Sequence, residues 1–231
     1  MLQLGFLKML KGSKIREQAQ LHQYEYRQYP PYEVLSNSYL SYDDLIVLKG
    51  VEDLVEKYYN SGRFVKSLNY IITTLAGFKS PFQFYLDFYQ YCDKKNLLGS
   101  PVAARDLYGI LYGYLKDLQD ASAEKLLDLS YMKELMKYDV LASDRSGYLP
   151  KPITRYMEKG FKESCINFLS EQNNIDRYLP KYKGVRPEEI MRKVRFEIFR
   201  HNDESKTVLF DHSEKDRVTG LYPSFFVSLD S

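Results

Sequence analysis

The pattern of apolar and polar positions predicts a mainly helical chain. From residue 41 to residue 193, apolar side chains recur every three or four positions, which is the spacing of one face of an α-helix. Serine before an apolar run caps a helix, and proline suits its first position. In chain order, the predicted helix starts are Lys14, Ser41, Phe64, Ser80, Ser100, Ser122, Ile153 and Arg186. Gly77 is expected to end the helix that starts at Phe64.

The period changes near the C-terminal end. Val194–Phe199 and Thr207–Phe210 alternate between apolar and polar residues, and Ser224–Leu229 is a third short apolar run. Polar turn segments separate the three runs, so they predict a small antiparallel sheet of three strands. The predicted fold class is therefore α+β, mainly α, with a multi-helix domain and a C-terminal sheet.

The N-terminal run Leu2–Leu10 also alternates and predicts a strand. A lone strand leaves its backbone N–H and C=O groups unpaired, so this one needs neighbours. Two interpretations stay open on the residues alone: the run joins the C-terminal sheet, or its neighbours lie outside this chain. After a helix from Lys14 to about His22, Pro30 and Pro31 forbid a helix and predict an extended linker.

Composition and charge restrict the class of protein. The chain has 33 basic and 31 acidic residues, a net charge of +2, which argues against a nucleic-acid binder or an anionic-membrane binder. No run approaches the roughly 18 apolar residues of a membrane-spanning helix. A hydrophobic content of 44% with two cysteines is typical of a globular cytoplasmic protein.

Aromatic residues are the unusual part of the composition. There are 22 Tyr and 13 Phe and no Trp. The favoured interpretation is a helical core rimmed with tyrosines, whose hydroxyl groups reach water or a partner. The alternative is a stacking surface for a ligand or for nucleic acid, and the near-neutral charge counts against nucleic acid.

Few residues suggest catalysis or metal binding. Cys92 and Cys165 fall on apolar helix faces without a nearby histidine, so we expect them to be packed core thiols. His201 and His212 flank one predicted strand and have aspartates nearby. A metal site there is conceivable, but a solvated polar hairpin end is the favoured interpretation.

Three further charged motifs have a structural explanation. Asp43-Asp44 and Glu188-Glu189 could serve general acid–base chemistry, but both fall in the first turn of a predicted helix, where they complement its dipole. Lys14 and Arg16, after Gly12-Ser13, could meet a phosphate at a helix N-terminus. An amphipathic first turn is the favoured interpretation.

Several segments together carry a resemblance to a known family. They are Leu2–Ser13, Pro30–Leu35, Leu40–Leu45, Tyr58–Phe64, Ser80–Phe82 and Phe196–Phe199. In this order they resemble the C-terminal region of cobalamin-binding radical S-adenosylmethionine proteins, in the subgroup with a helical C-terminal domain of unknown function. Lys11 and Ser13 depart from the usual turn, where Pro and Thr are more common.

The resemblance implies a division of the chain. Residues 1–23 would be the last strand and helix of a radical S-adenosylmethionine barrel, residues 24–40 a Tyr/Pro-rich linker, residues 41–193 a helical domain, and residues 194–231 a small sheet packed on it. The intact enzyme, of the Fe-S oxidoreductase type, would use a 4Fe-4S cluster, S-adenosylmethionine and cobalamin. Its Cys-x3-Cys-x2-Cys motif does not occur here.

The resemblance also implies the chain's role and partners. The backbone of Phe6, Leu7, Lys8 and Met9 would contact S-adenosylmethionine in the intact enzyme. The chain alone would bind no cofactor and would not be catalytic. In the intact enzyme it would cover the substrate site, and its partners would be the upstream barrel and cobalamin domains and an unknown substrate. As a fragment it would form a domain-swapped dimer or a dimer through an apolar patch. The alternative is a stand-alone helical protein-interaction module.

Overall fold

The computed structural model describes residues 1–75, 79–98 and 101–229. The chain divides into two compact units. Unit 1 consists of residues 1–61 and 78–100, and unit 2 of residues 62–77 and 101–231. Gly77 and Ser100, which were expected to end one helix and begin another, lie outside the described residues.

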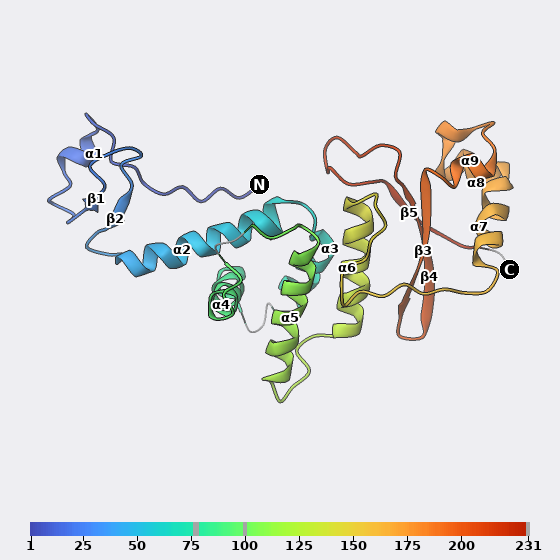
Figure 1. Ribbon diagram of the computed structural model, residues 1–231, viewed down its shortest axis with the longest axis horizontal. Helices are drawn as coiled ribbons and strands as arrows, with labels where there is room; N and C mark the ends of the chain where they lie inside the picture. Colours follow the sequence, from blue (N-terminus) through green and yellow to red (C-terminus); the bar gives the residue numbers. More distant parts are fainter. Residues whose placement is uncertain (76–78, 99–100, 230–231) are drawn as a thin grey trace. The chain divides into compact units, whose positions relative to one another are not determined.

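Unit 1 is built on two capped helices (Figure 1). Its elements are α1 (Lys14–Glu17), β1 (Glu25–Tyr26), β2 (Val34–Ser36), α2 (Tyr42–Leu54), which continues as the π-helical segment η1 (Val55–Asn60), and α4 (Pro81–Lys94). Ser41 begins α2 as predicted, because its Oγ accepts from the Asp44 N–H at 3.1 Å. Ser80 begins α4 in the same way, through the N–H of Gln83 at 3.1 Å.

The N-terminal predictions were wrong in detail. Residues 2–10 form one isolated bridge, between Lys8 and Glu33, and no strand. The expected linker supplies that bridge, and within it β1 and β2 pair antiparallel. The helix expected up to His22 is one turn long, because the chain reverses and the Tyr24 N–H bonds to the Ala19 carbonyl at 2.9 Å.

Unit 2 carries the rest of the helices and the larger sheet (Figure 1). Its helical elements are α3 (Val65–Leu75), α5 (Asp106–Asp120), α6 (Leu129–Ser143), α7 (Phe161–Ser170), α8 (Gln172–Tyr178), η2 (Pro180–Tyr182) and α9 (Pro187–Ile190). The strands β3 (Val194–His201), β4 (Glu204–Asp211) and β5 (Ser224–Val227) form an antiparallel sheet in the order β3-β4-β5. This confirms the α+β fold class and the three predicted strands.

Both faces of the sheet are covered by helices (Figure 1). Side chains alternate along β3, so Val194 and Phe196 join the core formed with α7, α8 and α9. Phe199 points to the opposite face and packs with Leu141 of α6. The sheet therefore separates two apolar clusters, and α6 has the sheet on one side.

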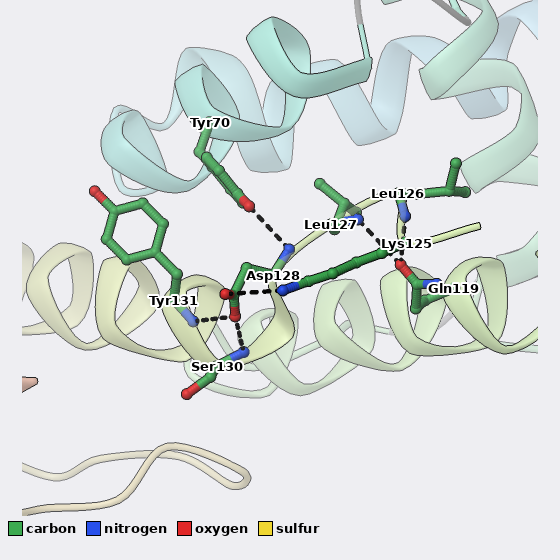
Figure 2. A network of polar contacts seen from close by, with 8 residues as sticks. All are labelled: Tyr70, Gln119, Lys125, Leu126, Leu127, Asp128, Ser130 and Tyr131. Atoms are coloured by element: carbon green, nitrogen blue, oxygen red, sulfur yellow. Dashed lines mark hydrogen bonds and ion pairs between the residues drawn. The ribbon is translucent and has the colours of Figure 1, made fainter. Parts of the chain in front are cut away.

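Three predicted helix starts in unit 2 were wrong. The helix expected after Ser122 begins at Leu129, because Gln119 Oε1 accepts from the N–H groups of Leu126 and Leu127 at 2.8 and 3.0 Å and holds the intervening loop (Figure 2). Asp128 is the actual cap of α6: its Oδ1 accepts from the Ser130 N–H at 2.9 Å and the Tyr131 N–H at 3.0 Å.

The other two starts are also displaced towards the C-terminus. The helix expected after Pro101 begins at Asp106. The helix expected over Ile153–Asn173 is α7, which begins at Phe161 because Gly160 has a left-handed φ of 81°, a conformation that interrupts a helix. No helix in the described parts of the chain has the length and apolar character needed to cross a bilayer.

Candidate functional site

A cleft of about 270 Å³ lies in unit 2, between α6 and the side of the sheet that faces α6. We call it the α6 cleft. Its lining includes Tyr131, Glu134, Tyr138, Phe199, His201 and Phe226. A larger hollow of about 780 Å³ lies near Phe161 and Val227, but its lining contains no buried titratable side chain. The α6 cleft is therefore the candidate site.

Flat rings form the walls of the α6 cleft. Tyr131 and Tyr138 lie two helical turns apart on α6, so both point to the same side. The Tyr131 ring stacks on His201 with centroids 4.1 Å apart and planes inclined by 30°. The centroids of the Tyr138 and Phe199 rings are 6.1 Å apart. The Phe226 side chain is 66% exposed and leaves this side of the cleft open to a ligand.

A buried ion pair lies behind these walls. The Lys137 side chain has no exposed surface, its Nζ lies 3.0 Å from Glu134 Oε2, and it donates to the Ile198 carbonyl at 2.6 Å. The same Nζ lies 4.4 Å from the centroid of the Tyr156 ring. Burial lowers the pKa of Lys137, and the hydrogen bond and charge of Glu134 oppose that change.

Glu134 connects this pair to the cleft. Its Oε1 accepts from the Tyr156 hydroxyl at 3.2 Å, and its Oε2 accepts from the Arg200 N–H at 3.0 Å. Both carboxylate oxygens are therefore bonded, and the negative charge is balanced by Lys137. Glu134 acts as a link between α6 and β3 rather than as a free acid or base.

A second buried acid lies on β3, on the face of the sheet that also carries Phe199. Glu197 is 2% exposed and accepts from Arg155 Nε at 3.0 and 3.1 Å. Arg155 also donates to the Gly147 carbonyl at 2.9 Å. Burial raises the pKa of Glu197, whereas Arg155 and Lys137 lower it. Because every charged group in this cluster is bonded and none is an accessible nucleophile, the arrangement supports ligand binding better than covalent catalysis.

The four residues expected to contact S-adenosylmethionine lie in unit 1. The Leu7 carbonyl accepts from the Val34 N–H at 3.2 Å, and the Met9 N–H donates to the Tyr32 carbonyl at 2.8 Å. Lys8 forms the bridge to Glu33, and Lys49 Nζ lies 5.5 Å from the centroid of the Phe6 ring. Their expected contact with the cofactor stays a prediction.

The predicted thiols are buried. Burial raises the pKa of Cys92 to about 11 and that of Cys165 to about 12, which confirms them as core thiols. They belong to different compact units. An iron–sulfur cluster needs several thiolates at one place, so the cysteines of this chain do not fit one.

The two histidines have separate roles. His201 lies in the α6 cleft, stacked on Tyr131. His212 is 4% exposed, and its Nε2 lies 2.8 Å from the Leu141 carbonyl. The prediction of a solvated hairpin end was wrong for His212, because β4 ends against α6. No group of three or more potential metal ligands occurs among the described residues.

The charged motifs have the expected structural roles. Asp43 and Asp44 lie in the first turn of α2, and Glu188 and Glu189 lie in that of α9. The two hydrogen bonds from Ser41 lower the pKa of Asp44. Arg16 donates to the Met9 carbonyl at 2.9 Å, and Lys14 also falls in the single turn of α1.

The sequence pattern did not indicate that Glu134 and Lys137 are buried beside a cleft. Three residues apart on a helix, they have the spacing of an ordinary surface ion pair. The available signal was the apolar stripe of α6, where Met132 and Met136 alternate with these charges and are fully buried. A helix with buried residues on both sides of its charged positions is packed on two sides, which places those charges in the interior.

The comparisons with known proteins identify a family. A family model described as "Protein of unknown function (DUF4080)" matches residues 20–218. The chain belongs to this family. No curated protein and no solved structure matches the chain. The DUF4080 match includes the α6 residues and the β3 and β4 residues that line the α6 cleft, whereas Phe226 lies beyond it.

Proposed function

We propose that the chain is the non-catalytic C-terminal part of a cobalamin-dependent radical S-adenosylmethionine iron–sulfur enzyme, in which it covers the substrate site. The observation that carries this proposal is the exposure of the N-terminal leucines. The exposed fractions of Leu2, Leu4, Leu7 and Leu10 are 51%, 38%, 41% and 55%. An apolar segment of this kind indicates a protein surface that binds it.

The resemblance of the sequence motifs supports the barrel of this enzyme class as that surface. Leu2–Ser13 resembles the last barrel strand of this enzyme class, and the other quoted segments follow in the order of its C-terminal region. The DUF4080 match begins at residue 20, close to the boundary expected after residue 23. In the proposal, the leucines of residues 2–10 pack against the remaining barrel strands.

The proposal assigns the cofactor chemistry to the upstream domains. The cluster would cleave S-adenosylmethionine there, and this chain would exclude water and shape the substrate site. In the proposal this chain contributes no thiolate ligand, since Cys92 and Cys165 are both buried and belong to different compact units. The backbone of Phe6–Met9 is the part of the chain assigned to the nucleoside.

Two polypeptides test the proposal: this chain, and a longer one that adds the upstream coding region in the same reading frame. Both are reconstituted anaerobically with iron and sulfide and assayed for 5′-deoxyadenosine formation from S-adenosylmethionine. We expect the longer polypeptide to bind a cluster and form the product, and this chain to do neither. Stoichiometric iron and sulfide on this chain alone would overturn the proposal, as would a longer polypeptide without a cluster.

A further inference from the structure

The α6 cleft combines stacked rings with a cation that lacks a carboxylate partner. Lys66, at the N-terminal end of α3, lines the cleft, and its Nζ lies 5.5 Å from the centroid of the Tyr138 ring. Among the described residues, no carboxylate lies within ion-pair distance of this amino group. The Lys66 side chain is thus available to a ligand.

The other cations of the cleft are neutralised. Lys206 Nζ lies 2.9 Å from Glu204 Oε2 at the rim. The Arg200 guanidinium lies 2.7 Å from Glu158 and stacks over the Tyr156 ring. The charge of Glu134 is balanced by Lys137, as described above. Of the lysines and arginines that line the described cleft, Lys66 is therefore the one whose amino group has no ion-pair partner. Its charge also acts on the buried carboxylate of Asp139, which lies outside the lining, and its amino group is the place in the cleft that favours an anion.

The size and the walls restrict the rest of the ligand. Pockets for drug-sized molecules start at roughly 300 Å³, so a cleft of about 270 Å³ suits a smaller molecule of one or two rings. Tyr138, Phe199 and the exposed Phe226 offer ring surfaces, and stacking on such surfaces is tolerant of the exact ring. A planar ring meets both conditions, whereas a saturated ring loses the stacking.

We propose that the α6 cleft binds a small planar aromatic or heteroaromatic anion, with the ring against Tyr138 and Phe226 and its carboxylate or phosphate at Lys66. A cationic ring is not expected to bind. It would meet the positive charge of Lys66, and the Glu134 carboxylate is not free because both of its oxygens already accept hydrogen bonds. The inference is independent of the proposed enzyme parentage, since every residue it uses lies within unit 2 of this chain.

Titration of the full chain tests the ligand class. Indole-3-carboxylate and phenyl phosphate are added separately, and binding is followed by calorimetry and by NMR chemical shifts. These two probes distinguish a carboxylate from a phosphate ligand. Neutral indole and cyclohexanecarboxylate are the matched controls. We expect at least one aromatic anion to bind about tenfold more tightly than both controls. Failure of both anions to bind at about 10 mM, or equal binding of neutral indole, would overturn the proposal.

Two pairs of variants test the location. Lys66→Gln removes the cation proposed to bind the anion, and its control is Lys133→Gln, a lysine on α6 whose Nζ lies 5.3 Å from the centroid of the Tyr112 ring. Phe226→Ser removes an exposed wall, and its control is Phe82→Ser, also exposed, in unit 1. Both cleft variants should weaken binding of the aromatic anion about tenfold, and both controls should leave it unchanged.

A loss of binding in these variants has to be separated from a loss of stability. The backbone N–H of Lys66 donates to Asp139 Oδ1 at 3.0 Å, and Lys66→Gln keeps this bond while it removes the side-chain charge that lowers the pKa of Asp139. Phe226 is 66% exposed and is not part of the core. Unfolding curves identify any variant that is not folded. Undiminished binding by folded Lys66→Gln would place the ligand elsewhere and overturn the proposal.

Discussion

Lys137 and Glu134 form an ion pair, Nζ to Oε2 3.0 Å, in which the lysine side chain has no exposed surface. The pair ties α6 to β3, because Lys137 also donates to the Ile198 carbonyl and Glu134 accepts from the Arg200 N–H. Lys137 and Glu134 therefore fix the distance between the two elements that enclose the α6 cleft. We therefore expect a substitution of either residue to lower the free energy of unfolding, and any effect on ligand binding to follow from that loss.

Replacing Lys137 with methionine should be strongly destabilising. The substitution leaves the buried Glu134 carboxylate without its counter-charge, and breaking a buried pair in this way costs about 3–5 kcal/mol. Chemical denaturation measures the free energy of unfolding. The double variant Lys137→Met with Glu134→Gln should recover part of the loss, because glutamine keeps hydrogen-bonding capacity without charge. A Lys137→Met protein as stable as the parent would contradict this role.

Asp139 should make the stability depend on pH. Its carboxylate accepts from the N–H groups of Lys66 and Ser67 at 3.0 and 2.8 Å, and its burial raises its pKa from 3.8 to about 6. Between about pH 4 and pH 6 the folded state keeps a proton that the unfolded state has released. The free energy of unfolding should therefore fall as the pH rises through this window, by about 3 kcal/mol for this group.

Comparison with Asp139→Asn isolates this effect. Asparagine does not titrate, and the other carboxylates are common to both proteins. The difference in unfolding free energy, parent minus variant, should fall between pH 4 and pH 6 and then level off. A difference that is constant across this range, measured by urea denaturation at each pH, would show that Asp139 titrates normally.

The corrected cap of α6 can be tested against the expected one. Asp128→Ala removes the acceptor of the Ser130 and Tyr131 N–H groups and should cost about 1 kcal/mol, within a range of 0.5–2 (Figure 2). Ser122→Ala is the control, because Ser122 accepts only in an exposed turn, from the Glu124 N–H at 3.2 Å. Its cost should stay within about 0.5 kcal/mol. Equal costs in thermal unfolding would argue that Asp128 is not the cap.

The exposed N-terminal leucines should cause self-association of this chain when it is alone. We expect a dimer in sedimentation velocity experiments at high protein concentration, since a large part of these apolar side chains is exposed to solvent. Leu4→Ser together with Leu7→Ser should shift the chain to monomer. Leu21→Ser, at a site that is 74% exposed and outside residues 2–10, is the control and should not. A chain that stays monomeric would count against a buried role for these leucines.

Local patterns were sufficient for much of the fold. The strand β3 follows from the alternation of residues 194–198 and β4 from its short apolar run, and the starts of α2 and α4 follow from serine caps whose bonds are made within one turn. These features depend on neighbours in sequence. Ser122 was misleading because Gln119, on the preceding helix, holds the loop and delays the start of α6 until Asp128.

The candidate site depended on tertiary structure. His201 and Tyr131 meet only because β3 packs on α6, and the Lys137–Glu134 pair is buried only because α6 has the sheet on one side. Alternation in residues 2–10 predicted a strand, but a strand also needs a partner over its length. Among the residues that the structure describes, that partner is limited to a bridge at Glu33.

The most direct test of the enzyme parentage is the DNA sequence immediately upstream of the codon for Met1 in the source genome. The account predicts an open reading frame that continues upstream, in the same frame, through a Cys-x3-Cys-x2-Cys triplet. An in-frame stop codon followed by a ribosome-binding site of its own would contradict it. The chain would then act alone, and its function would have to be sought in its partners.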